Sequence, residues 1–143
     1  KYGDQNSYKS SDKVNQFPYT LAYKRKEMVE YFKDLTKLRR ECAFLHESDP
    51  KVSKERVRFE NLPDGGAAII YNADHDLTPY RIFNVYVNPN KEPIFVDLNV
   101  PLKIILNRAG YIGARSSEYV ERVMVAPQSV IVLGLRAEDP GLK

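Results

Sequence analysis

The sequence is first informative for what it lacks. Its 143 residues include no tryptophan and a single cysteine, Cys42, so no disulfide can form within the chain. No apolar run approaches the roughly 20 residues that span a bilayer, so we expect no membrane partner. The net charge of +3 arises from basic and acidic residues mixed along the chain, unlike the single-signed patch of a nucleic-acid-binding protein. With 43% hydrophobic residues, the chain is expected to fold as one ordinary domain, with or without an added fragment.

One amphipathic helix is predicted over residues 20–41. Apolar side chains recur there at helical steps, and charged side chains occupy the opposite side. Thr20 is the expected N-cap. The basic cluster at 24–26 is interpreted as a solvated helix face, because Glu27 and Glu30 lie within helical reach. The apolar stripe consists of Met28, Phe32, Leu35, Leu38, Cys42 and Leu45.

After residue 50 the helical period gives way to short β-type runs. Turn-forming Asn, Pro, Asp and Gly separate these runs, which recur about every ten residues. This spacing predicts an antiparallel β-sandwich over residues 52–143, with Ile131 and Leu133 facing inward. The fold class is therefore mainly β, a C-terminal sandwich preceded by one helix. The predicted strands are 56–59, 67–72, 81–87, 93–98, 102–106, 118–125 and 129–135.

The stretch NSYKSSDKVNQ, residues 6–16, concentrates polar side chains ahead of the helix. It can be a polar loop, because Ser, Asn and Asp side chains bond their own backbone and favour turns. It can also be a surface that binds a hydroxyl-rich ligand. The candidate site residues are Asn6, Tyr8, Asp12 and Asn15.

Other candidates for chemistry have simpler interpretations. Asp97 is expected on an exposed strand face, and Cys42 on the apolar helix stripe as a small core residue. His46 follows the helix, where it suits the negative end of the helix dipole. The run Asp-His-Asp at 74–76 is interpreted as a solvated turn, since adjacent side chains alternate in direction, and Gly65 lies in a hairpin turn. We therefore predict no metal site, no cofactor and no catalytic carboxylate pair in the chain.

Tyrosines are the alternative to tryptophan for stacking on sugars. Tyr80, Tyr86, Tyr111 and Tyr119 could form such a platform in an independent binding module. Tyrosines that alternate along strands more often cover a sandwich core with their hydroxyls in water, and we expect that arrangement here.

The order of several motifs resembles the C-terminal part of type I pullulanases, debranching glycoside hydrolases of the α-amylase superfamily. KYGDQNSYKSSDKVNQ is similar to the segment after the eighth barrel strand, with a pattern close to G-D-x-N-S-Y-x-x-x-D-x-V-N-Q. YFKDLTKLRRECAFL is similar to the last barrel helix. RFENLPDGGAAIIYNADHD, VYVNPNKEPIFVDL and VMVAPQSVIVL resemble the C-terminal sandwich, whereas FPY replaces the family's Ile-Asp-Trp-like triplet.

The resemblance implies a domain division and a place for the polar loop. Residues 1–48 would be a remnant of the (β/α)8 barrel, and residues 49–143 the C-terminal β-sandwich domain. The four candidate loop residues would lie at the rim of the barrel, where they contact sugar hydroxyls or brace neighbouring loops. The family's catalytic carboxylates come from barrel strands four, five and seven, so they would precede Lys1. We therefore expect the chain to be a processed or excised piece.

Two functions stay open from the sequence. The first is the C-terminal fragment of a pullulanase-like enzyme that hydrolyses α-1,6-glucosidic bonds in pullulan, starch or glycogen, non-catalytic by itself. Its partners would be the α-glucan substrate and the missing barrel, and an uncovered stripe at Met28, Phe32, Leu35 and Leu38 would favour self-association. The second is an independent carbohydrate-binding or protein-interaction sandwich. The exact glucan is left open, as is the location in the cytoplasm, periplasm or exterior of a bacterium.

Overall fold

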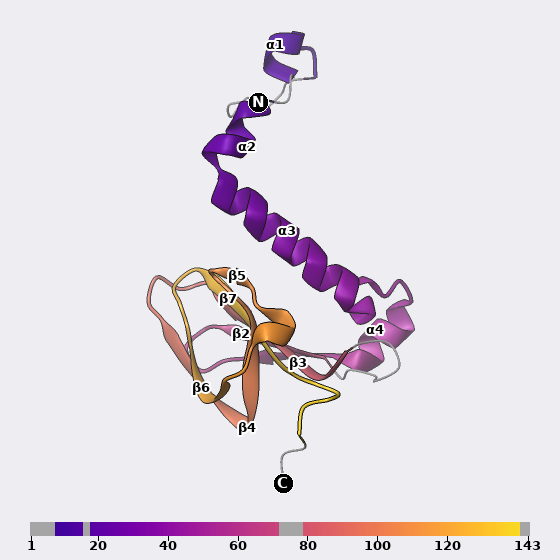
Figure 1. Ribbon diagram of the computed structural model, residues 1–143, viewed down its shortest axis with the longest axis vertical. Coiled ribbons are helices and arrows are strands. Elements are labelled where there is room, and N and C mark those ends of the chain that lie inside the picture. Colours follow the sequence, from indigo (N-terminus) through magenta and orange to yellow (C-terminus); the bar gives the residue numbers. More distant parts are fainter. Residues whose placement is uncertain (1–7, 16–17, 72–78, 141–143) are drawn as a thin grey trace.

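The structure is a computed structural model that describes residues 8–15, 18–71 and 79–140 (Figure 1). Helices come first and strands follow residue 56, as the change of hydrophobic period predicts. The helical elements are α1 (Asp12–Asn15), α2 (Thr20–Lys24), α3 (Lys26–Glu41), η1 (Ala43–His46), α4 (Pro50–Arg56) and η2 (Gly113–Arg115). The strands are β1 (Val57–Asn61), β2 (Ala67–Tyr71), β3 (Tyr80–Asn88), β4 (Ile94–Asn107), β5 (Gly110–Tyr111), β6 (Tyr119–Val125) and β7 (Ser129–Arg136).

The helix predicted over residues 20–41 has the expected extent, but it is divided in two. α2 and α3 meet at Arg25, whose φ of −120° and ψ of 39° are not helical. Thr20 is the first residue of α2 and not its N-cap, which is Tyr19 without a side-chain capping bond. The prediction of an N-cap at Thr20 is therefore wrong, because Tyr19 itself already has helical backbone angles, φ −52° and ψ −27°.

A second helix, α4, was not expected from the hydrophobic pattern. Asp49 caps it by accepting a hydrogen bond of 2.8 Å from the Lys51 N–H, and Pro50 occupies its first turn. Seven residues are too few for an apolar stripe to be read from the sequence. The capping residues Asp49 and Pro50 were the available signal.

The strands pair antiparallel throughout the described part of the chain and form one seven-stranded sheet in the order β1-β2-β3-β7-β4-β5, with β6 beside β4. β4 pairs with β6 from Ile94 to Asp97 and, after a register shift, again at Leu102 and Lys103, whereas it pairs with β7 from Lys103 to Leu106. This change of partner folds the sheet into two layers, and the antiparallel sandwich is confirmed. The strands predicted at 93–98 and 102–106 are one bent strand, and the two-residue β5 is additional.

The sheet has a hydrophobic core on each face. The inter-layer core lies between the two layers and includes Leu133 and Ile131 of β7, so both residues face inward as predicted. The helix-side core lies between the sheet and α3 with η1, and includes Val132 from the same strand. β7 is apolar at consecutive positions because layers cover both of its faces.

Aromatic rings hold η1 against the sheet in the helix-side core. Phe44 of η1 packs edge-on to Phe83 of β3 with ring centroids 5.0 Å apart, and its ring lies 4.9 Å from that of Tyr71. Such pairs stabilise by about 0.5–1.5 kcal/mol beyond the burial of their area. The segment after α3 is therefore packed into the same core as the strands.

Candidate functional site

The apolar stripe of α3 changes its surroundings along the helix. At the C-terminal end Leu38 is 5% exposed and Cys42 is fully buried, which confirms Cys42 as a core residue. At the N-terminal end Met28 is 60% exposed and Phe32 is 63% exposed, and Leu35 is exposed to a smaller extent, 37%. Figure 1 shows the same division, since the N-terminal end of α3 with α2 and α1 extends away from the sheet. We call Met28, Phe32 and Leu35 the exposed half of the stripe.

A backbone contact fixes the middle of α3 to the sheet. The Asp34 carboxylate accepts a hydrogen bond of 2.9 Å from the Tyr111 N–H of β5. Gly110 precedes this residue at φ +122°, and a Cβ at Gly110 would collide with the Asp34 carboxylate. A glycine is favoured here both by the backbone angle and by the close approach of the Asp34 carboxylate.

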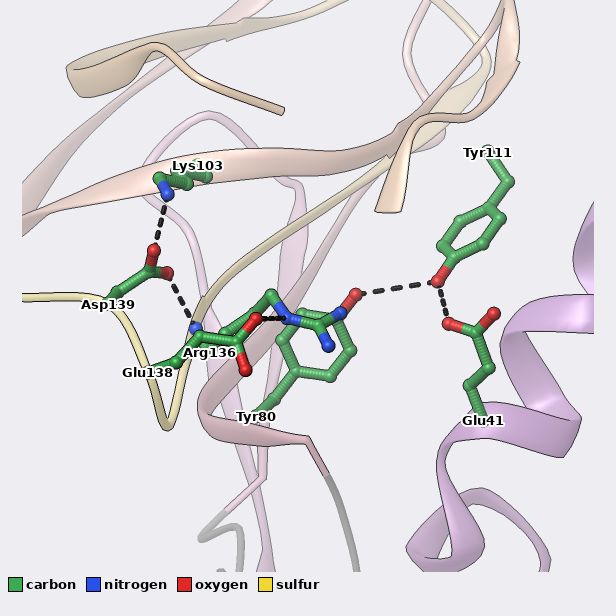
Figure 2. A network of polar contacts seen from close by, with 7 residues as sticks. All are labelled: Glu41, Tyr80, Lys103, Tyr111, Arg136, Glu138 and Asp139. Atoms are coloured by element: carbon green, nitrogen blue, oxygen red, sulfur yellow. Dashed lines mark hydrogen bonds and ion pairs between the residues drawn. The ribbon is translucent and has the colours of Figure 1, made fainter. Parts of the chain in front are cut away.

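Polar side chains continue this attachment to the end of α3. The Tyr111 hydroxyl donates to the Glu41 carboxylate and lies 3.5 Å from the Tyr80 hydroxyl (Figure 2). Burial, followed by the hydrogen bond to Glu41, raises the pKa of Tyr111 well above its usual range. Burial likewise raises the pKa of Tyr80. Both phenols therefore stay protonated, and Tyr111 remains a donor to the helix across the ordinary pH range.

A second polar cluster closes the end of β7 (Figure 2). Asp139 accepts a hydrogen bond of 2.8 Å from the Arg136 N–H and pairs with Lys103 of β4. Burial alone would raise the pKa of the Asp139 carboxyl, but the Lys103 ammonium and the Arg136 N–H outweigh it, so the pKa is lowered. The cluster joins the segment after β7 to β4.

The tyrosine prediction is wrong for most of its members. Tyr80, Tyr86 and Tyr111 are at most 6% exposed, so these side chains are buried and do not form a wet cover over the core. Each hydroxyl has a polar neighbour. The Asn84 amide nitrogen, for example, lies 3.3 Å from the Tyr86 hydroxyl oxygen. Tyr119, 40% exposed, has the Lys103 ammonium 4.8 Å from its ring centre. Alternation in a strand could not reveal these buried polar partners.

The structure places three of the four candidate loop residues. Tyr8 is 90% exposed in a turn, and Asp12 and Asn15 are the two ends of α1. The Asn15 amide donates to the Ser10 carbonyl at 2.9 Å, a contact within the loop. Asn6 lies outside the described residues. The substrate-binding or bracing role of the four therefore stays a prediction.

Asp97 has the exposed strand position that the sequence suggested. Asp97 is exposed on β4 and lies 3.3 Å from Arg122, and His46 is exposed at the end of η1. The 74–76 run lies outside the described residues. In the described ranges, no three His, Cys, Asp or Glu side chains gather as metal ligands would. None of the described helices is long and apolar enough to cross a membrane.

Comparison with solved structures identifies what this arrangement resembles. A pullulanase from Bacillus acidopullulyticus matches 93% of the chain with a TM-score of 0.82 and 26% identity. The chain resembles part of a pullulanase. The match includes helices and strands together because it covers almost the whole chain, but only 16% of that pullulanase. This is consistent with a C-terminal pullulanase domain.

Two more distant pullulanases share the fold. Type I pullulanase from Bacillus subtilis str. 168, solved with maltose, matches 90% of the chain with a TM-score of 0.77 and 19% identity, over 18% of its own length. Pullulanase from Anoxybacillus sp. LM18-11, solved with maltotetraose, matches 87% of the chain at TM-score 0.73 and 16% identity, over 18% of its length. No protein-family model matches the sequence. No significant match to a curated protein is found.

Sequence reasoning missed the attachment of α3 to the sheet. The residues that make it are Asp34 and Glu41 on the helix and Tyr80, Gly110 and Tyr111 on the sheet. Asp34 is one of several acidic residues on a charged helix, and nothing in the sequence around it indicates that it binds Tyr111. A glycine followed by an aromatic residue at 110–111 was the available signal for a close approach.

Proposed function

We propose that the chain is the C-terminal part of a pullulanase-like enzyme that hydrolyses α-1,6-glucosidic bonds in pullulan, starch or glycogen. The match to the Bacillus acidopullulyticus pullulanase carries this proposal, because it extends over α3 and the sheet in one superposition. In this proposal residues 1–48 contribute the loop after the eighth strand and the last helix of a (β/α)8 barrel. Residues 49–143 form the sandwich that supports it, and the catalytic carboxylates belong to the barrel.

The exposed half of the stripe supports the proposed placement of α3 between two bodies. Leu38 and Cys42 pack into the helix-side core, whereas Met28 and Phe32 have no such cover in the described residues. Fully burying side chains of this size contributes about 1.5–3 kcal/mol each. A barrel packed on this face would supply that burial, and the polar attachment at Tyr111 would hold α3 in register with the sandwich.

A graft tests this proposal. In the Bacillus acidopullulyticus pullulanase, the matched 16% of the chain is replaced by these 143 residues, and reducing-sugar release from pullulan is measured. We expect the hybrid to hydrolyse pullulan, and the 143-residue chain alone to release no sugar above a boiled control.

A matched pair of variants makes the graft specific. Phe32→Glu in the hybrid should abolish folding or activity because it places a charge in the proposed helix–barrel contact. Phe59→Glu, at a residue that is 73% exposed on β1, should leave both unchanged. A folded hybrid without activity, or sugar release by the chain alone, would contradict the proposal.

A further inference from the structure

A cleft opens at one end of the space between the two layers of the sheet. Its volume is about 780 Å³, within the roughly 300–1,000 Å³ of small-ligand pockets. β1 and β3 form one wall, and β4 forms the other where its pairing with β6 is interrupted between Asp97 and Leu102. The polar lining used below consists of Arg58, Glu60, Arg81, Asn84, Tyr86 and Asn99.

Two neighbouring side chains on β3 leave hydrogen-bonding capacity unused in this cleft. The Asn84 Nδ2 donates to the Tyr86 hydroxyl at 3.3 Å, but the buried Asn84 Oδ1 has no partner among the described residues. Turning the amide over would exchange the two atoms and leave Nδ2 buried without a partner instead. An unpaired buried polar atom costs about 1–3 kcal/mol. A ligand group that both donates and accepts satisfies the site in either orientation, and a hydroxyl is such a group.

The charges of the cleft favour a neutral ligand. Its basic lining residues are Lys54, Arg56, Arg58 and Arg81, and its acidic ones are Glu55, Glu60 and Asp97. Arg58 already pairs with Glu60 at 2.8 Å, and Arg81 donates to the Pro140 carbonyl at 3.4 Å. A phosphate site would hold a cluster of unopposed cations. Here basic and acidic side chains alternate in the lining, and Arg58 and Asp97 each lie beside an opposite charge, which suits a polyhydroxy compound.

The floor of the cleft is apolar and can meet the faces of sugar rings. Ile82, Val96 and Leu102 line it, and Tyr86 adds aromatic surface. A pyranose presents hydroxyls at its edges and C–H groups on its faces, so it matches a polar wall above an apolar floor.

We propose that this cleft binds a segment of an α-1,4-linked glucan at a second site of the protein, with Asn84 and Tyr86 bonding a sugar hydroxyl. The choice of an α-glucan among saccharides rests on the proposed function. The cleft lies on the inter-layer side of the sheet, whereas α3 packs on the other side. Binding here is therefore separate from the loop at residues 8–15.

The test is a titration of the isotope-labelled 143-residue chain with maltotetraose, followed by two-dimensional NMR. Cellotetraose and inorganic phosphate serve as comparison ligands. We expect maltotetraose to shift the Asn84 side-chain amide and the backbone amides of Arg58 and Asn99. Asn84→Leu and Tyr86→Phe should each weaken binding about tenfold, the loss of roughly one hydrogen bond. Asn61→Leu, an exposed Asn of β1 whose side chain does not line the cleft, should bind as wild type does.

The outcomes separate this proposal from the proposed function. No shift with millimolar maltotetraose would overturn the cleft site, as would shifts confined to Tyr8, Asp12 and Asn15. Shifts with phosphate alone would also overturn it, because they would assign an anion. Equal binding of cellotetraose would overturn the α-glucan assignment. The graft experiment does not depend on any of these results, and Tyr86→Phe keeps the ring, so a folding defect in Asn84→Leu leaves the test intact.

Discussion

The two halves of α3 carry the same apolar stripe and have opposite surroundings. Leu38 is 5% exposed against the sheet, whereas Phe32, less than two turns earlier, is 63% exposed. The difference extends beyond the helix, because Tyr19 and Tyr23 of the preceding segment are 76% and 86% exposed. Periodicity predicts that a face is apolar, but it does not say which body covers it. Within one helix, half of the stripe belongs to the sandwich core and half is left for another surface.

The first prediction truncates Leu38, a buried residue of the stripe. Leu38→Ala should lower the free energy of unfolding by about 2–5 kcal/mol, because it leaves a cavity in the helix-side core. The matched change Met28→Ala on the exposed half should alter it by less than about 0.5 kcal/mol. Urea unfolding followed by circular dichroism measures both. Equal losses of unfolding free energy in the two variants would contradict the difference in burial between the two halves of the stripe.

A second prediction concerns the close approach at Gly110. Gly110→Ala should cost about 1–3 kcal/mol, because the new Cβ meets the Asp34 carboxylate and φ of +122° strains any side chain. Gly65→Ala is the control for strain alone: φ is +78° there and a Cβ would have only ordinary contacts at 3.8 Å. Thermal unfolding should rank Gly110→Ala as the more destabilised. The reverse ranking would mean that the helix does not depend on this approach.

A third prediction follows from the raised pKa of Tyr111. An unfolded tyrosine ionises near pH 10.0, but folded Tyr111 keeps its proton because of burial and its bond to Glu41. Its contribution is therefore complete below about pH 10 and is lost as pH rises further toward the folded pKa. Tyr111→Phe should lose about 1–2 kcal/mol at neutral pH and show a weaker decline above pH 10.

The control for this pH dependence is a tyrosine in the exposed region. Tyr23→Phe, at an 86% exposed position, should match the wild-type unfolding free energy because it removes no buried contact. Unfolding curves between pH 7 and pH 11 compare the three proteins. An unchanged slope in Tyr111→Phe would show that this phenol does not set the alkaline decline.

Much of the fold could be predicted from the sequence because it depends on local period. The extent of the helical region to Glu41, the antiparallel strands and the inward positions of Ile131 and Leu133 all follow from spacing. The single bent strand β4 could not be predicted. Pro101 in its middle removes a backbone donor and suggests a break, but the register shift before Leu102 accommodates it.

The candidate site was harder to predict from the sequence than the fold, because it depends on tertiary contacts. The partners of Asp34 and Glu41 are 77 and 70 positions further along the chain, and nothing in a charged helix marks them. The cleft beside Asn84 arises where two strands stop pairing, which no single run of residues encodes. The role of the loop residues Tyr8, Asp12 and Asn15 is still a prediction from resemblance.

The smallest expected effect on stability comes from the exposed half of the stripe. Phe32→Glu should change the unfolding free energy by less than about 0.5 kcal/mol, since the side chain is 63% exposed. It should nevertheless abolish the self-association that we predict for the isolated chain. Of the four residues expected to form that surface, Met28, Phe32 and Leu35 are exposed, whereas Leu38 is buried in the helix-side core and does not contribute. Sedimentation velocity over a range of concentrations measures this. A wild-type chain that stays monomeric at high concentration would contradict the prediction.

The central claim is that α3 packs into the sandwich core at its C-terminal end and leaves its apolar surface uncovered at its N-terminal end. Hydrogen exchange along α3 tests this claim most directly. In the 143-residue chain we predict that the amides of Leu38 and Glu41 exchange as slowly as those of β7. The amides of residues 27–32 should exchange much faster, and packing on a barrel in the grafted pullulanase should slow them. Uniform protection along α3 in the isolated chain, or fast exchange at Leu38, would contradict the account.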